Sequence, residues 1–490
     1  MIRRIATTVA ALALAAGTAA AAPDRLTLGM VLEPPNLDPT AGAAAAIDEV
    51  VYANVFEGLT RFAPDGSIRP ALAQGWEVTE GGRVWTFRLH AGVTFHDGTA
   101  MDAEDVKFSL DRARAPDSAN AQKALFAGIE TVEVLDPLTV RVTLKAPNGA
   151  FDFNMAWGDA VIVAPETAAG NATSPVGTGP FRLARWVQGD RVELEANPAY
   201  WGEKPALAAA TFRFIADPTA AFAAMMAGDV DAFPNYPAPE TLAQLGADPR
   251  FRVIVGSTEG ETILAMNNAR PPLNDARVRA AIAHAIDRQA IIDGAMFGYG
   301  TPIGTHFAPH NPDYLDLTDL SAHDPDRARA LLAEAGVSGL KLRLALPPPT
   351  YARRGGEIIA AQLRAVGIET EISNLEWAQW LEQVFKGRDF DLTIVSHTEP
   401  ADINIYARAD YYFHYARPEF VALMDRLSVT TDPAARSDLL KQAQQMIAED
   451  HVNGYLFQLA KTGVANARVQ GLWENAPTQA NDLTAVRWAD

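Results

Sequence analysis

The stretch "WTFRLHAGVTFHDGTAMDAEDVKFSL", residues 85–110, combines a strand pattern, a turn signal and the start of a helix. Its first residues alternate, with Trp85, Phe87 and Leu89 on one face and more polar residues on the other, which is typical of a β-strand. The Asp97–Gly98 pair is a turn signal. The pattern after this turn predicts a helix that packs into a core. We therefore expect a protein that combines strands and helices.

The same stretch is rich in carboxylates, which raises the question of a metal or catalytic site. A metal site would need a second histidine or another ligand at a defined spacing from His96, and no such ligand is adjacent. A structural role accounts for the acids. Asp102 and Asp105 match a capping box, and Glu104 lies in the first helical turn, where the helix dipole favours negative charge. We therefore interpret residues 95–108 as scaffold.

Length and composition limit the class of protein. The chain has 490 residues, more than the roughly 250–300 residues at which single cores tend to split, so two or three lobes are expected. There is no cysteine. This excludes disulfides, a thiolate nucleophile, a cysteine metal site and a lipid-anchored N-terminal cysteine.

The N-terminus predicts export from the cytoplasm. Arg3 and Arg4 precede an apolar stretch from Ile5 to Ala16, and small residues follow. This order is typical of a secretory signal peptide, which we place at residues 1–21 with cleavage after Ala21. Since no lipid anchor is expected, we predict a freely diffusing protein in a bacterial periplasm.

The net charge argues against two classes of partner. The formal charge is −19, and it becomes −21 when two arginines leave with the signal peptide. Such an acidic chain is unsuited to nucleic acid and to anionic membranes. The charge does not select a small ligand.

Strand and helix patterns alternate irregularly along the rest of the chain, without an internal repeat. We expect strands within 25–32, 83–90, 191–202 and 340–346, a hairpin within 130–145, helices within 274–292 and 323–336, and a helix followed by a strand within 355–372. This mixture predicts an α/β fold.

The stretch "DLTIVSHTEPADINIYARADYYFHY", residues 391–415, is the most unusual in the chain. Asp391 to Val395 predict a buried strand, and ligand crevices of α/β domains lie at the carboxyl ends of such strands. Glu399 and Asp402 follow it, and Tyr406 begins a run of aromatic residues. Acids and aromatic faces together suit a cationic group. A solvated acidic loop over an aromatic core is the alternative.

A basic segment, "PPPTYARRGGE" at residues 347–357, follows the predicted strand 340–346. Either Arg353 or Arg354 could bind a carboxylate with two hydrogen bonds, or both could be ordinary surface residues. Trp377 and Trp380 lie three residues apart on one predicted helical face. They belong either to the core or to the wall of a pocket.

Seven strings, in this order, resemble the extracytoplasmic solute-binding proteins of the dipeptide, oligopeptide and nickel ABC-transporter family. They are "PPNLDP" (34–39), "VFEGLTRFAPDGSIRPALAQGWEV" (55–78), "WTFRLHAGVTFHDGTAMDAEDVKFSL" (85–110), "GTGPFRL" (177–183), "NPAYWG" (197–202), "AMNNARPPLNDARVRAAIAHAIDR" (265–288) and "DPDRARALLAEAG" (324–336). The resemblance covers essentially the whole mature chain.

The resemblance implies a two-lobed clamshell of three domains with mixed sheets and a ligand cleft between the lobes. Domain I would comprise residues 22–64, 176–265 and 456–490, domain II residues 65–175, and domain III residues 266–455. The partner would be an ABC permease with its ATPase subunits. No enzymatic activity and no cofactor would be expected.

The resemblance also implies binding residues. The acid that holds a peptide's α-amine falls on Glu399 or Asp402, and the arginine for its carboxylate falls in the "ARR" string. Backbone after the first strand would line the pocket. The expected set is Thr40, Gly42, Ala43, Arg353, Arg354, Trp377, Trp380, His397, Glu399, Asp402 and Tyr406, with no metal ligand.

Two classes of function remain. The favoured hypothesis is a periplasmic binding component for a peptide-like ligand, with a nickel chelate, a sugar or an opine-like conjugate as alternatives. The rival is a secreted hydrolase that uses Glu399 and Asp402, although the chain has no G-x-S-x-G motif. Turnover of the ligand discriminates between the two classes.

Overall fold

The computed structural model describes residues 24–415 and 417–489, so the predicted signal peptide at 1–21 lies outside the described residues. The strands are β1 Arg25–Met30, β2 Thr60–Phe62, β3 Ile68–Pro70, β4 Ala73–Thr79, β5 Val84–Leu89, β6 Ile129–Asp136, β7 Thr139–Leu144, β8 Phe181–Val187, β9 Arg191–Ala196, β10 Ala209–Phe214, β11 Ala232–Phe233, β12 Phe251–Met266, β13 Thr301–Pro302, β14 Leu340–Leu346, β15 Ile368–Asn374, β16 Leu392–His397, β17 Asn453–Asn466, β18 Val469–Gln470 and β19 Arg487–Trp488.

The α-helices are α1 Ala45–Val51, α2 Ala103–Arg114, α3 Phe151–Asn154, α4 Pro218–Ala227, α5 Leu242–Gly246, α6 Ala276–Ala285, α7 Arg288–Met296, α8 Pro325–Glu334, α9 Thr350–Ala365, α10 Trp377–Trp380, α11 Pro418–Val429 and α12 Pro433–Glu449. Among the described residues, no helix is both long and apolar enough to cross a membrane.

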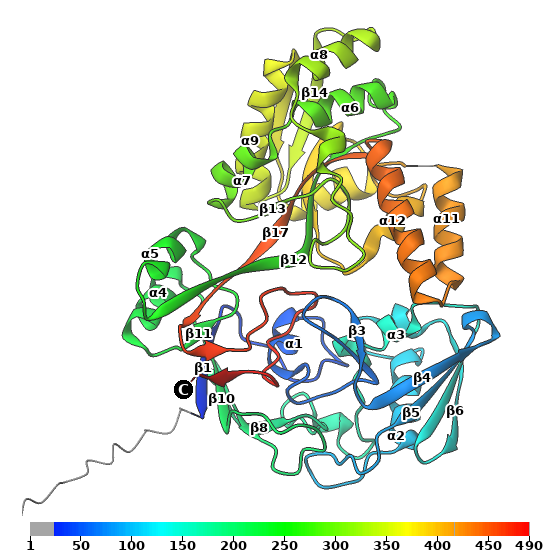
Figure 1. Cartoon of the computed structure of the whole chain (residues 1–490), viewed down its shortest axis with the longest axis vertical. Helices are drawn as coiled ribbons and strands as arrows, with labels where there is room; N and C mark the ends of the chain where they lie inside the picture. Colours follow the sequence, from blue (N-terminus) through cyan, green and yellow to red (C-terminus); the bar gives the residue numbers. More distant parts are fainter. Residues whose placement is uncertain (1–23, 416, 490) are drawn as a thin grey trace, which may run out of the picture.

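The molecule has two lobes, which β12 and β17 connect (Figure 1). The lower lobe contains β1 to β11 with α1 to α5, and the upper lobe contains β13 to β16 with α6 to α12. One sheet of 11 strands continues through both lobes in the order β15-β14-β16-β12-β17-β11-β1-β10-β9-β8, with β13 beside β17. The two connecting strands are antiparallel and paired from Phe251↔Asn466 to Ala265↔Asn453. The lobes therefore share a sheet.

A smaller four-stranded sheet, in the order β4-β5-β7-β6, forms a separate layer in the lower lobe. Helix α2 packs on it, and Phe87, Val106, Val140 and Val142 belong to the same buried apolar cluster. Asp102 Oδ1 accepts the amide of Glu104 at 2.8 Å, while Asp105 Oδ2 accepts the amide of Asp102 at 2.9 Å. The predicted capping box is confirmed, so these acids begin a helix.

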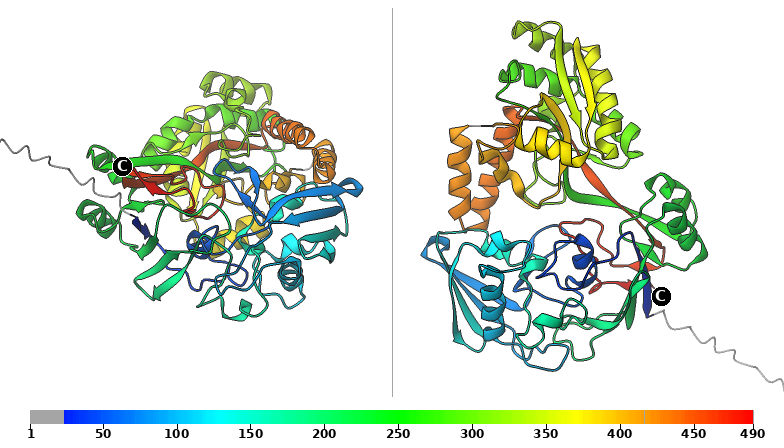
Figure 2. Two further views of the ribbon diagram at one scale, coloured as in Figure 1. Left: turned by 60° about the horizontal axis from the view of Figure 1, so that its bottom comes forward. Right: turned by 180° about the vertical axis from the view of Figure 1, so that it is seen from behind.

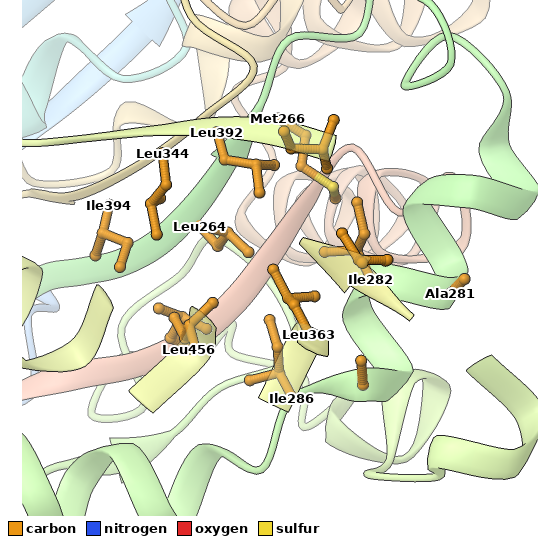
Figure 3. Packing of buried hydrophobic residues seen from close by; sticks show 14 of the residues in the cluster. Leu264, Met266, Ala281, Ile282, Ile286, Leu344, Leu363, Leu392, Ile394 and Leu456 are labelled. Atoms are coloured by element: carbon orange, nitrogen blue, oxygen red, sulfur yellow. The ribbon is translucent and has the colours of Figure 1, made fainter. Parts of the chain in front are cut away.

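In the upper lobe, β14 pairs in parallel with both β15 and β16, and α9 connects β14 to β15. The core lies between this sheet and helices α6 to α9 (Figure 3), where Leu264, Ile282, Leu344, Leu363 and Leu456 are fully or almost fully buried. Residues separated by up to about two hundred positions thus form one packed unit.

Two predicted helices differ from the structure. The helix expected within 274–292 is divided into α6 and α7, because Asp287 Oδ1 accepts the amide of Ala290 and starts a second helix. The helix expected from 355 begins earlier, at Thr350. Arg353 and Arg354 therefore lie inside its first turns rather than ahead of it.

The lobes also touch away from β12 and β17. The amide of Gly149, next to α3, donates to the carbonyl of Ser428 in α11 at 2.7 Å. A Cβ atom on Gly149 would lie 1.9 Å from the Thr430 carbonyl oxygen. Figure 2 shows from behind how the ends of α11 and α12 reach the smaller sheet layer of the lower lobe. Only glycine fits this close backbone contact.

His96, from the opening stretch, connects two backbone segments. Its Nδ1 accepts the Gly177 amide at 3.3 Å, and its Nε2 lies 3.0 Å from the Gly179 carbonyl oxygen. Burial lowers the pKa of His96 from 6.5 to about 4. The folded protein therefore holds a neutral imidazole at pH values where the unfolded chain takes up a proton.

We expect this histidine to make the fold less stable in mild acid. Between pH 7 and pH 5 it should lower the free energy of unfolding by about 2 kcal/mol, because only the unfolded state binds the proton in this window. His96→Gln should lose correspondingly less stability over the same range. Urea unfolding at both pH values tests this, with His323→Gln, at a more exposed residue, as control. Equal losses in wild type and His96→Gln would contradict it.

Candidate functional site

The carboxyl ends of β14, β15 and β16 lie at one edge of the upper-lobe sheet, because β14 is parallel to both neighbours. Helix α9 follows β14, helix α10 follows β15, and residues 398–415 follow β16. Ligands of α/β domains bind at such edges. The fold thus brings Arg353, Trp377 and His397 to the same edge from separate parts of the sequence.

Two histidines flank Asp402 at this edge. His306 Nε2 lies 2.7 Å from Asp402 Oδ1, and His397 Nδ1 lies 3.6 Å from Asp402 Oδ2. Burial alone would raise the pKa of Asp402, but the two histidines hold it below its usual value, so the carboxylate is ionised. Burial lowers the pKa of His397 to about 4. These three side chains could hold a metal ion.

Tyrosine hydroxyls hold both imidazole rings from the other side. The Tyr412 hydroxyl lies 3.1 Å from His397 Nε2, and the Tyr406 hydroxyl lies 3.4 Å from His306 Nδ1. The side-chain amide of Asn453 in β17 donates from Nδ2 to the Tyr406 hydroxyl at 3.0 Å. Tyr406, which the sequence suggested for ligand stacking, is fully buried and supports His306.

An aromatic cluster extends from His397 to the surface. The Trp377 and Trp380 rings are 5.7 Å apart between centroids, and Trp380 is 6.0 Å from Tyr412, which stacks on His397. Trp380 is 3% exposed and donates from Nε1 to Thr393 Oγ1 at 2.9 Å. Trp377 is 43% exposed. Of the two tryptophans, Trp380 belongs to the core and Trp377 is accessible.

Carboxylates surround the histidines. Glu261 of β12 pairs in register with His397 of β16, is buried, and has no hydrogen-bond partner at Oε2. Burial raises its pKa, and the charges of Glu259, Asp402 and Glu399 add to that rise. Glu399 is exposed, and it accepts the Thr398 amide at 3.1 Å. The site therefore has a negative potential.

The two candidate arginines point to different neighbours. Arg353 Nη2 pairs with Glu376 at 3.0 Å, and its Nε has no partner. The guanidinium of Arg354 lies 5.7 Å from the ring centroid of Phe297, beyond the end of α7. Arg353 thus lies beside the carboxyl end of β15, whereas Arg354 lies beside α7.

In the lower lobe, the predicted residues after β1 have structural contacts. Thr40 is buried, its hydroxyl accepts from Arg112 Nη1 at 2.6 Å, and it lines a cavity of about 280 Å³. A Cβ atom on Gly42 would lie 2.4 Å from Ile47 Cδ1. Ala43 is exposed. The hydrogen bonds of Thr40 hold the loop in place, and the loop packs too closely at Gly42 to admit a side chain.

A second cavity, of about 110 Å³, lies at the carboxyl end of β1. Met30, Leu32, Glu49 and Asn235 are among its lining residues, and Asn235 donates to Glu49 Oε1 at 3.2 Å. Burial raises the pKa of Glu49. Since β10 and β11 run parallel to β1, this is the lower lobe's equivalent of the upper-lobe edge.

Sequence reasoning missed His306 and Glu261 as parts of the site, and it treated Tyr412 only as one of the aromatic residues after β16. His306 comes from the loop after β13, and nothing near it in the sequence resembles a binding motif. Glu261 directly precedes the mostly apolar run "TILAM", which ends β12. An acid next to such a run is unusual in a buried strand, so it was a usable signal.

Comparisons with known proteins agree with this architecture. The sequence model of "Bacterial extracellular solute-binding proteins, family 5 Middle" matches residues 67–454. The chain is 31% identical over 440 residues to the glutathione-binding protein GsiB of Pectobacterium atrosepticum, covering 85% of each chain. It is 28% identical over 417 residues to the dipeptide-binding protein of Escherichia coli, covering 76% of this chain and 78% of the other.

Solved structures agree as well. HbpA2 from Haemophilus parasuis superposes with a TM-score of 0.86 at 25% identity, covering 95% of this chain and 99% of the other. A nickel ABC transporter protein from Bacillus halodurans superposes with a TM-score of 0.83 at 26% identity, covering 94% and 99%. The predicted two-lobed α/β fold is confirmed, and the chain belongs to the bacterial extracellular solute-binding proteins of family 5.

Proposed function

We propose that this protein is the periplasmic receptor of an ABC importer for short peptide-like ligands, which it delivers to a membrane permease with ATPase subunits. Relatives named for glutathione and dipeptide binding support the ligand class. The observation that carries the proposal is the edge formed by β14, β15 and β16, where an accessible acid, an accessible tryptophan and an incompletely bonded arginine gather.

The acids at this edge suit the α-amine of a peptide. Glu399 is exposed and accepts only a local amide among its recorded contacts, so an ammonium group can approach it. Asp402 is already flanked by two histidines. Glu399 is therefore the better candidate for direct contact, and Asp402 adds negative potential behind it.

Arg353 suits the carboxylate of the same ligand. Its partner Glu376 has a side chain that is 73% exposed, and exposed ion pairs contribute only about 0–1 kcal/mol. A ligand carboxylate that binds with two parallel hydrogen bonds can replace such a pair. Arg354 remains the alternative for this role.

The position of the edge favours a receptor that closes on its ligand. The site adjoins β12 through the pairing of Glu261 with His397, so it lies next to the strands that connect the lobes. The predicted lower-lobe contacts, Thr40 to Ala43, together with the cavity beside Glu49, would meet a ligand held there. A ligand that touches both lobes stabilises the closed state. Export by the signal peptide predicted at residues 1–21 would deliver the receptor to the periplasm.

Removal of the acids tests the amine contact. The double variant Glu399→Gln/Asp402→Asn should bind a dipeptide, tripeptide and glutathione panel at least about 100-fold more weakly than wild type, because two charged interactions are lost. Glu399→Gln alone should cost about 10-fold or more. Isothermal titration calorimetry in EDTA measures both variants.

Glu419→Gln, on the exposed surface of α11, is the matched control and should bind like wild type. Unchanged affinity in the double variant would refute the site. Mass spectrometry of the released ligand should show an unaltered peptide, whereas a hydrolysed peptide would refute the receptor class.

Substitution of Trp380 should mainly affect stability, and substitution of Trp377 should mainly affect ligand binding. Trp380→Ala should lower the free energy of unfolding by about 3–5 kcal/mol, because a buried indole is removed. Trp377→Ala should change stability by less than about 1 kcal/mol and weaken peptide binding by several fold. Urea unfolding and calorimetry check the pair. Similar stability losses in both variants would contradict the assignment of Trp377 to the ligand.

A further inference from the structure

Three side chains from separate parts of the upper lobe converge beside β12. His306 follows β13, His397 ends β16, and Asp402 begins the short 3-10 helix Asp402–Ala407. One donor atom of each residue lies within 4.8 Å of the other two. We propose that these residues form a binding site for a divalent first-row transition metal ion.

The donor set fits such an ion. Imidazole nitrogens suit zinc, copper, iron and nickel, and a carboxylate supplies negative charge. Bonds of about 2.0–2.2 Å in a tetrahedral site place neighbouring donors about 3.3 Å apart. The two observed separations, 2.7 Å from His306 and 3.6 Å from His397 to the Asp402 carboxylate, lie on either side of that value. Small side-chain rotations would therefore accommodate the ion.

The rings are already oriented as in metal sites. A metal-bound histidine usually bonds through its second nitrogen to a group behind it, which fixes the ring and its tautomer. Tyr412 occupies that position behind His397 at 3.1 Å. Tyr406 does so behind His306 at 3.4 Å, and Asn453 holds the Tyr406 hydroxyl. All of these supporting groups are buried.

A buried acid beside the cluster supplies an independent argument. Glu261 is 3% exposed and is the register partner of His397, so their side chains are neighbours on the sheet. Its Oε2 has no hydrogen-bond partner. A buried carboxylate oxygen without a partner is costly, and a dication bound next to it would offset that cost. Glu261 is also placed to become a fourth ligand.

The metal site does not depend on the peptide receptor proposed above, because all of its proposed donors are side chains of this protein. Three protein ligands leave at least one coordination position open. In the receptor, the amine or carboxylate of a peptide would complete the coordination, so that the protein would capture a metal–peptide complex. This last step rests on the proposed function, whereas the metal site itself does not.

The test uses full-length mature protein without a histidine tag, after removal of metals with EDTA and dialysis. Calorimetric titration with ZnCl2 and with NiCl2, in the absence of peptide, should show one ion bound per chain. His306→Gln and His397→Gln should each weaken binding at least about 100-fold, because a ligand is lost. His323→Gln, at a histidine of the same lobe that pairs with Asp287, should bind like wild type.

A more conservative variant keeps the test informative if the buried histidine variants do not fold. Tyr412→Phe keeps the ring and removes the hydroxyl behind His397, and it should weaken metal binding by about 10-fold. Absence of Zn2+ and Ni2+ binding in wild type, or equal affinity in wild type, His397→Gln and Tyr412→Phe, would overturn the site. Peptide binding in EDTA is a separate measurement, so loss of the metal proposal and loss of the receptor proposal give different results.

Discussion

The antiparallel pairing of β12 with β17 is the constraint on which the rest of the structure depends. These strands belong to one sheet that continues into both lobes, and their registry runs from Phe251↔Asn466 to Ala265↔Asn453. The registry shifts between Ser257 and Glu261 and again between Thr262 and Ile263. Because Glu261 is also paired with His397, the strands that join the lobes position the candidate site. A strand that connects the lobes therefore also carries part of the candidate site.

The candidate site buries ionisable side chains, whereas the rest of the upper-lobe core is mostly apolar. Next to the site, the face of the sheet that carries Glu261 and His397 continues with apolar residues such as Ile263 and Val395. At the site, the same sheet buries Glu261 and His397 among carboxylates. Burial of such groups lowers stability unless they are compensated. Folded proteins retain this kind of local conflict mainly at functional sites.

Much of the architecture could be predicted from local sequence signals. The capping residues Asp102 and Asp105 are confirmed, because a cap acts within a few residues of itself. The helix predicted within 323–336 is present as α8, which Asp324 caps in the same local way. The division of α6 from α7 was missed, since Asp287 lies inside an apolar pattern that continues across it. The acid and aromatic residues after β16 could be proposed as a site from the sequence because they are contiguous. His306 was not found, since only the tertiary fold brings it to Asp402, 96 residues away.

The glycine contact between the lobes has a consequence for how the molecule can move. The Gly149 amide bonds to the Ser428 carbonyl far from the crossing strands, and a side chain at Gly149 has no room. Any rotation of one lobe against the other must either break this hydrogen bond or take place about an axis that passes near it. The contact between Gly149 and Ser428 therefore restricts which relative motions of the lobes preserve the observed structure.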